Sequence, residues 1–363
     1  MEHKFFMGGN NMSLNVASVS ADELIPGMIL AKEVIHNDNV LLREGSIVNE
    51  EIIDRLRNIL LLDKLDVYIS TDVIEKNTKE AEIKKVEQAF KEVSNELENL
   101  YTKIDTIKED NISDLREFAW KIQKQFKNSE RIINSVLFQG SGDDCVYRHG
   151  VNVAFLSALI GKWIGYDSDQ INDLIYAGLL HDFGVTKLSE ELQSKPDLEL
   201  QVNSDAVKEH VRIGYEAVKE LKCINKRVIC GILMHHERCD GSGYPIGATR
   251  DNIHPFAKII AIADEIDVLN SNKELKEKKG AFHVLSAIKE MSLNLLDYKY
   301  SKAFLEHISN FYIGEEVVLD NGETAKILYM DMNDLENPLL VKDGDFINLK
   351  FNKDVHIREV IVK

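Results

Sequence analysis

The sequence feature that most constrains the fold is the placement of ionisable residues inside apolar helical segments. Asp264 lies in the nearly continuous apolar run FAKIIAIADEIDVL, and His181–Asp182 ends the apolar segment LIYAGLLHDF. A buried carboxylate is costly unless it is paired or binds a metal ion. The segments that carry these acids are therefore expected to bring them to a shared site with compensating partners.

Five histidines occupy positions that suit such a site. His149 and His210 each share a helical stripe with apolar residues, so their side chains are expected to point inward. His235 and His236 follow the apolar segment VICGILM, and His181 precedes Asp182. A single inward histidine is more often an ordinary core residue, but five histidines with two aspartates supply enough ligands for two metal ions.

The donor types indicate which ions and which chemistry fit this set. Imidazole and carboxylate together suit iron, manganese or zinc. Two adjacent ions can lower the pKa of a bridging water and neutralise a phosphate during in-line attack, so the set favours phosphodiester hydrolysis.

The periodicity of the apolar residues divides the chain into four parts. Residues 1–72 predict a small α/β module, 73–138 a helical linker or hairpin, and 139–310 an almost wholly helical domain. In residues 311–363 the period shifts towards two, and Asn321–Gly322 predicts a β-hairpin. We therefore expect a mainly α fold, with a helical bundle, a small N-terminal α/β unit and a small C-terminal β appendage.

Apolar residues spaced by three and four form a heptad pattern within residues 79–110. Its members are Ile83, Val86, Phe90, Val93, Leu97, Leu100, Ile104 and Ile107. Two interpretations remain open. The segment could pair with its copy in a homodimer, or it could pack against the next helix of the same chain.

Composition excludes several classes of partner. The formal net charge of −17 disfavours binding to DNA, RNA or an anionic membrane surface. The apolar stretch VAFLSALIG is too short to insert into a bilayer. The four cysteines form no CxxC pair, as is typical of reduced thiols in a cytoplasmic protein.

These motifs, in this order, resemble the HD-GYP family, a branch of the HD metal-dependent phosphohydrolases. The resemblance covers residues 140–310 and includes HD at 181–182, HHERCDGSGYP and AIADEIDVL. It implies a helical bundle that holds two divalent ions, iron or manganese rather than zinc. It also implies hydrolysis of cyclic di-GMP to linear pGpG and then GMP through a hydroxide between the metals.

The resemblance assigns roles to individual residues. Asp182 and His181 would form the catalytic centre, with Asp182 as the bridging carboxylate. Substrate would meet Asp240 and the signature loop Gly243, Tyr244 and Pro245. The metal ligands would be His149, His181, Asp182, His210, His235, His236 and Asp264.

The sequence departs from the family pattern at three places. The family has a phosphate-contacting lysine where this chain has Val185, and Lys187 is a candidate substitute. A basic arginine clamp is replaced by a segment that contains Lys273 and Lys276. Cys145 stands where members with a third metal have a glutamate, so two ions are expected.

Three functions remain open after these departures. The chain could be an active cyclic di-GMP phosphodiesterase. It could instead be a metal-bound cyclic-dinucleotide receptor or scaffold with little turnover, or a hydrolase of a related cyclic dinucleotide.

Overall fold

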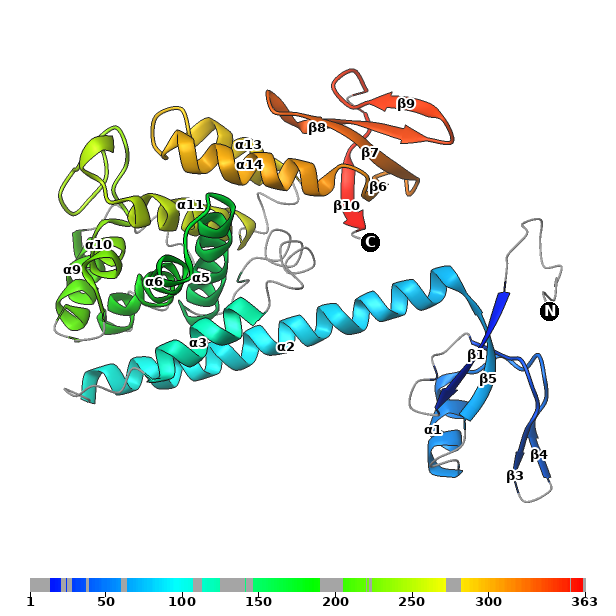
Figure 1. Ribbon diagram of the computed structural model, residues 1–363. Coiled ribbons are helices and arrows are strands. Elements are labelled where there is room, and N and C mark those ends of the chain that lie inside the picture. Colours follow the sequence, from blue (N-terminus) through cyan, green and yellow to red (C-terminus); the bar gives the residue numbers. More distant parts are fainter. Residues whose placement is uncertain are drawn as a thin grey trace. The chain divides into compact units, whose positions relative to one another are not determined.

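The computed structural model divides the chain into two compact units, residues 1–82 and 83–363. Figure 1 traces the elements of both units, which are described separately below. The residues that the structure describes are 14–20, 24, 28–36, 39–59, 64–106, 113–124, 141, 146–189, 205–219, 221, 224–271, 282–352 and 354–361.

The first unit is the predicted small α/β module. Strand β5 (Lys64–Ser70) pairs antiparallel with β1 (Leu14–Ser20) and with β2 (Ile29–Leu30), and β3 (Val34–His36) pairs with β4 (Asn39–Leu42). Helix α1 (Glu50–Ile59) begins after Asn49, whose Oδ1 accepts from the Ile52 amide at 2.8 Å. Leu30, Leu56 and Val67 are buried in the core of this unit.

Helix α2 (Thr71–Thr106) carries the heptad pattern, and α3 (Ser113–Lys124) follows it. In the second unit, Phe90, Val93, Leu97 and Leu100 are buried in one core with residues of α3 and of the helical domain. Lys121 of α3 also pairs with Glu96 of α2 at 2.6 Å. Over Phe90–Leu100 the pattern is therefore used inside the chain, as in the second interpretation. The side chains of Ile83, Val86 and Ile107 lie outside the described set, and the homodimer through residues 79–110 stays a prediction.

The helical domain consists of α5 (Val146–Trp163), α6 (Ser168–Leu180), α9 (Asp205–Val218), α10 (Lys226–Met234), α11 (Pro255–Ser271), α13 (His283–Met291) and α14 (Tyr298–Tyr312). Helices α5 and α6 cross closely at Gly178, where a Cβ atom would lie 2.6 Å from Ala154 Cα. Two short 3₁₀ helices, η3 (Phe183–Lys187) and η4 (Arg250–Asn252), lie in the connections. These packed helices form the mainly α fold that the periodicity predicts.

The chain ends in an antiparallel sheet of β10 (Ile357–Ile361), β6 (Glu316–Leu319), β7 (Thr324–Asp331), β8 (Asp334–Lys342) and β9 (Asp345–Asn348), in that order. Gly322, in the predicted hairpin between β6 and β7, has φ of +82°, a conformation that glycine adopts without strain. Ile327 and Leu340 of this sheet belong to the same buried core as the helices. The predicted β appendage is confirmed, and it packs on the domain that precedes it.

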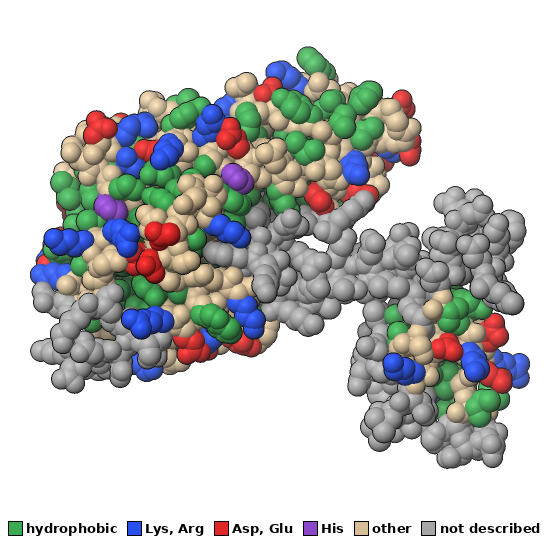
Figure 2. All heavy atoms as spheres, viewed as in Figure 1, with side chains coloured by type: hydrophobic (Ala, Val, Ile, Leu, Met, Phe, Trp, Pro, Cys, Tyr) green, Lys and Arg blue, Asp and Glu red, His purple; other side chains and the backbone are tan. Residues whose placement is uncertain are grey.

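Two surface properties bear on what the molecule can bind. None of the described helices is both long enough and apolar enough to cross a bilayer. Figure 2 shows basic and acidic side chains interspersed on the face that it presents. On that face, a phosphate-bearing ligand would therefore depend on local charges rather than on a broad basic surface.

Candidate metal centre

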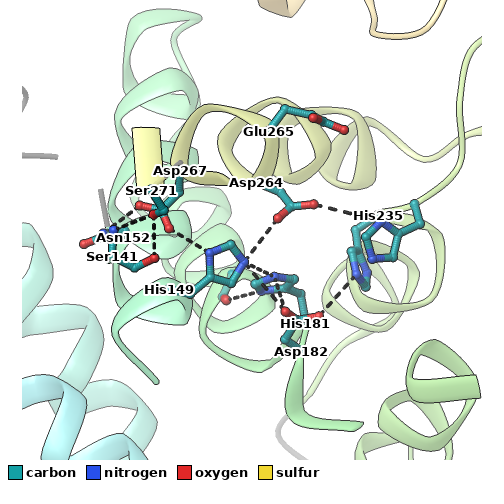
Figure 3. Close-up of polar contacts among 12 residues, drawn as sticks. Ser141, His149, Asn152, His181, Asp182, His235, Asp264, Glu265, Asp267 and Ser271 are labelled. Atoms are coloured by element: carbon teal, nitrogen blue, oxygen red, sulfur yellow. Dashed lines mark hydrogen bonds and ion pairs between the residues drawn. The ribbon is translucent and has the colours of Figure 1, made fainter. Parts of the chain in front are cut away.

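The side chains predicted as metal ligands converge from five helices of the second unit. His149 lies on α5, His210 on α9 and Asp264 on α11. His181 and Asp182 directly follow α6, and His235 and His236 directly follow α10. Because an apolar helix ends at each pair, the polar side chains stand where the packed helices meet (Figure 3).

The candidate ligand atoms form two groups, and within each group all of these atoms lie within 4.8 Å of one another. We call His149, His181 and Asp264 the acid-braced group. We call His210, His235 and His236 the imidazole group. Asp182 clusters with the imidazole group, but its carboxylate lies between the two.

The two oxygens of Asp182 face different groups. Its Oδ2 lies 3.6 Å from His149 Nε2 and 3.5 Å from His181 Nε2. Its Oδ1 lies 3.4 Å from His210 Nε2 and 3.7 Å from His235 Nε2. Ligand atoms about 2.1 Å from a common ion lie roughly 3 to 4 Å from one another. Asp182 thus has the geometry of a carboxylate that bridges two ion positions.

Asp264 reaches towards both groups from α11. Its Oδ1 lies 3.1 Å from His149 Nε2, and its Oδ2 lies 4.0 Å from His236 Nδ1. The sequence predicts that this buried acid needs partners. His149 of α5 and His236, directly after α10, are those partners.

Hydrogen bonds at Nδ1 orient the other histidines. The Nδ1 atoms of His181, His210 and His235 each lie 2.6–2.8 Å from the carbonyl oxygen three residues earlier. Donation from Nδ1–H to that carbonyl leaves the Nε2 lone pair directed at the site, where Nε2 of His181 lies 3.2 Å from Nε2 of His149. His210 Nε2 and His235 Nε2 are buried and, among the described residues, have no hydrogen-bond partner. Orphaned, unprotonated imidazole nitrogens around a carboxylate fit a divalent cation.

Asp267 is a residue of the candidate site that the sequence analysis missed. Its Oδ2 lies 2.8 Å from His149 Nδ1, and its Oδ1 accepts from Asn152 Nδ2 at 2.7 Å. This carboxylate is fully buried and fixes the orientation of the His149 ring. The signal was present, because Asp267 lies three residues after Asp264 and so on a similar face of the same apolar helix.

The electrostatics of the cluster also suit a cation. Burial lowers the pKa of His181 to about 4 and lowers the pKa values of His210 and His236. Burial alone would raise the pKa of Asp182, but the neighbouring histidines, His181 foremost, hold it well below its usual range. Three neutral imidazoles and an ionised carboxylate are the protonation states that metal binding requires.

His149 has the opposite behaviour. Burial would lower its pKa, but the hydrogen bonds to Asp264 and Asp267 raise it well above the ordinary value. Its Nδ1–H faces Asp267 and its Nε2–H faces Asp264, so the protonated ring would place beside the two buried acids a positive charge that a bound cation could supply instead.

The signature loop covers the imidazole group. The Tyr244 ring stacks on His236 with centroids 4.7 Å apart, and its buried hydroxyl has no hydrogen-bond partner among the described residues. Position 243 has no room for a side chain, because a Cβ atom there would lie 2.4 Å from the backbone nitrogen of Arg238 and 2.4 Å from the backbone oxygen of His236. Pro245, joined to Tyr244 by a cis peptide bond, is exposed. The loop thus brings an aromatic ring to the edge of the centre.

Glu237, a second residue that sequence reasoning missed, anchors this loop. Its two carboxylate oxygens accept from the amides of Ile246 and Ala248, both at 2.7 Å, and its side chain is buried. The available signal was the position of Glu237 directly after His235 and His236, two predicted metal ligands.

Several predicted substrate contacts do not join the cluster. Asp240 is exposed, and its Oδ1 accepts from the amide and the hydroxyl of Ser242 within its own turn. Lys187 is exposed, with Nζ 4.9 Å from the Phe183 ring centroid. Lys208 of α9, which sequence reasoning did not consider, lies over Tyr244 with Nζ 5.8 Å from the ring centroid. Cys145, Lys273 and Lys276 lie outside the described residues.

Comparisons with known proteins agree with this geometry. Residues 127–300 match the HD domain family. A cyclic di-GMP phosphodiesterase of Pseudomonas aeruginosa is 25% identical over 198 residues, which cover 54% of this chain and 48% of that protein. The cyclic di-GMP phosphodiesterase response regulator RpfG of Xanthomonas campestris is 34% identical over 140 residues, 36% of each chain.

A third relative differs in the substrate that its name gives. A 3'3'-cGAMP-specific phosphodiesterase of Vibrio cholerae is 26% identical over 168 residues, 46% of this chain and 38% of that protein. The chain thus spans about half or less of the length of these relatives. Residues 127–300, which carry the ordered motifs, are thus similar to the HD domain family.

Proposed function

We propose that residues 139–310 form a two-metal phosphodiesterase that hydrolyses cyclic di-GMP to linear pGpG and GMP. The observation that carries the proposal is Asp182, whose two oxygens face two separate sets of imidazole nitrogens. The names of the Pseudomonas and Xanthomonas relatives support the choice of substrate.

The residues of the chain divide between the two ion positions. The acid-braced group would hold one ion, the imidazole group would hold the other, and Asp182 would contact both. Nitrogen and carboxylate donors suit iron, manganese or zinc, and the resemblance to the HD-GYP family favours iron or manganese over zinc. Such ions supply a water of lowered pKa and neutralise charge on the phosphate.

The protein groups around the ions prepare the site for substrate. Asp267 holds the His149 ring in place, and Glu237 holds the signature loop so that Tyr244 covers His236. Lys208, over the ring of the same tyrosine, places a positive charge at the loop. We assign the substrate phosphates to the space beside this loop, with Gly243, Tyr244 and Pro245 as its edge.

Val185 favours a second candidate, a receptor that binds a cyclic dinucleotide and turns it over slowly. Valine has no donor for a phosphate oxygen, and Lys187, two residues later, is exposed beside Phe183. Loss of one donor to the transition state typically slows a reaction about 10²- to 10³-fold.

The test combines metal analysis with turnover. Protein purified without oxygen is assayed for iron and manganese, and cyclic di-GMP and 3'3'-cGAMP are each followed to linear products. We expect about two ions per chain and faster turnover of cyclic di-GMP. Two ions with binding but no product would overturn the enzyme and leave the receptor. Faster turnover of 3'3'-cGAMP would overturn the substrate assignment alone.

The Val185→Lys variant separates the candidates further. If the missing donor limits catalysis, turnover should rise about 10²-fold while the metal content stays the same. The matched control is Val185→Met, which adds length without charge. An equal rate in the two variants would contradict the role given to this position.

A further inference from the structure

A pocket of about 660 Å³ opens between α3, α6 and the start of α10, away from the metal centre. Its walls include Arg116 and Trp120 of α3, Asp169 and Asp173 of α6, and Arg227 of α10. None of the predicted metal ligands lines it. Its volume is in the range typical of small-molecule sites, about 300 to 1,000 Å³.

The lining combines an aromatic platform with charges of both signs. Trp120 is 60% exposed, and Lys124 lies over its ring with Nζ 5.1 Å from the centroid, so a stacked ligand would use the ring face that Lys124 does not cover. Arg116 and Asp169, both exposed, provide a cation and a carboxylate on neighbouring helices. A planar ring with both donors and acceptors on its edge matches these groups better than an apolar or purely anionic ligand.

Asp173 and Arg227 give the pocket a fixed polar wall. Asp173 is 93% buried, and its Oδ2 lies 2.6 Å from Arg227 Nη2. A guanidinium has five N–H donors, so this ion pair leaves donors for a ligand while it holds the group in place. Gln123 and Asn172 are likewise joined at 2.6 Å. The pocket is therefore a built polar site and not a gap between loose side chains.

We propose that this pocket binds a guanine nucleotide. The base would stack on Trp120, as nucleobases do on exposed aromatic side chains. Guanine presents two adjacent N–H donors, which suit the Asp169 carboxylate, and the acceptors O6 and N7, which suit a guanidinium. Of Arg116 and Arg227, the arginine that does not bind the base would pair with the phosphate, because arginine binds phosphate with two parallel hydrogen bonds. Adenine lacks the paired donors.

Two helices, α6 and α10, connect the pocket to the candidate metal centre. Asp173 lies eight residues before His181 along α6, and Arg227 lies eight residues before His235 along α10. Eight helical residues span about 12 Å. A nucleotide in the pocket would thus contact the far ends of the two helices that deliver four of the predicted ligands. Its binding needs neither metal nor turnover, so it stands apart from the proposed function.

The test uses tryptophan fluorescence of the full chain titrated with GMP. The chain has two tryptophans, so Trp163→Phe leaves Trp120 as the sole reporter. We expect saturable quenching with a Kd below about 1 mM, and AMP should bind at least about tenfold more weakly. No saturable quenching by GMP, or equal affinities for GMP and AMP, would overturn the proposal.

Variants locate the binding. Arg116→Ala and Asp169→Asn change exposed groups and should each weaken GMP binding about tenfold, whereas Arg212→Ala on α9, a matched loss of an exposed arginine, should not. Circular dichroism checks that each variant is folded. In an Asp182→Ala background the quenching should persist, because the metal centre is not involved. If quenching is instead lost with Asp182→Ala and kept with Arg116→Ala, GMP binds at the metal centre and this pocket is not its site.

Discussion

The acid-braced group and the imidazole group share Asp182, yet different partners support them. In the acid-braced group, His149 lies between two carboxylates, those of Asp264 and Asp267. In the imidazole group, His210 and His235 are held by backbone carbonyls, and His236 is covered by Tyr244. One candidate ion position therefore lies beside two buried carboxylates in addition to Asp182, and the other lies among neutral rings beside a loop.

This difference implies that the two positions are not equivalent. Negative charge close to a cation site raises its affinity, and carboxylates behind a ligating histidine raise the basicity of that ligand. We therefore expect the ion at the acid-braced group to bind more tightly. The ion at the imidazole group should exchange more readily and respond to changes in the signature loop.

The largest effect is expected from Asp182→Ala, which removes the residue common to both groups. Metal content should fall from about two ions to fewer than one per chain, and turnover should fall at least about a thousandfold. Elemental analysis and product formation measure the two effects. Asp251→Ala, at an exposed acid of η4, is the matched control and should change neither. If Asp182→Ala keeps both ions, the bridging role is wrong.

An intermediate effect is expected from Asp267→Asn. The amide keeps the shape but removes the charge behind His149, so affinity at the acid-braced group should fall about 10- to 100-fold. Competition with a metal-sensitive dye, read as two binding steps, measures each position. The weaker binding step, which is assigned to the imidazole group, should change little. Equal loss at both steps would show that the two groups are not independently supported.

The smallest effect is expected at Tyr244, on the imidazole side. Tyr244→Ala removes the ring stacked on His236 and should weaken the second binding step about tenfold, with the first unchanged. Tyr244→Phe keeps the ring and removes a buried hydroxyl that has no hydrogen-bond partner among the described residues, so metal affinity should match the wild type. If Tyr244→Ala weakened the first binding step more than the second, Tyr244 would support the acid-braced group rather than the imidazole group.

Much of the metal centre could be predicted because its signals are local. Each apolar helical segment shows its own inward face, and an acid or histidine on that face stands out against its neighbours. His149, His210 and Asp264 were found in this way, and the pairs at 181–182 and 235–236 were found at the ends of apolar segments. Asp267 and Glu237 were missed although each lies close to a predicted ligand, because their roles depend on partners elsewhere in the chain.

The sequence alone determined the helical and β regions, the inward histidines and acids, and their grouping by resemblance into one site. Only the tertiary structure decided which oxygen of Asp182 faces which histidines, that Phe90–Leu100 pack inside their own chain, and that α3, α6 and α10 enclose a second pocket. The physical reason is that periodicity fixes the face of one helix, whereas the pairing of faces depends on how all the helices pack together.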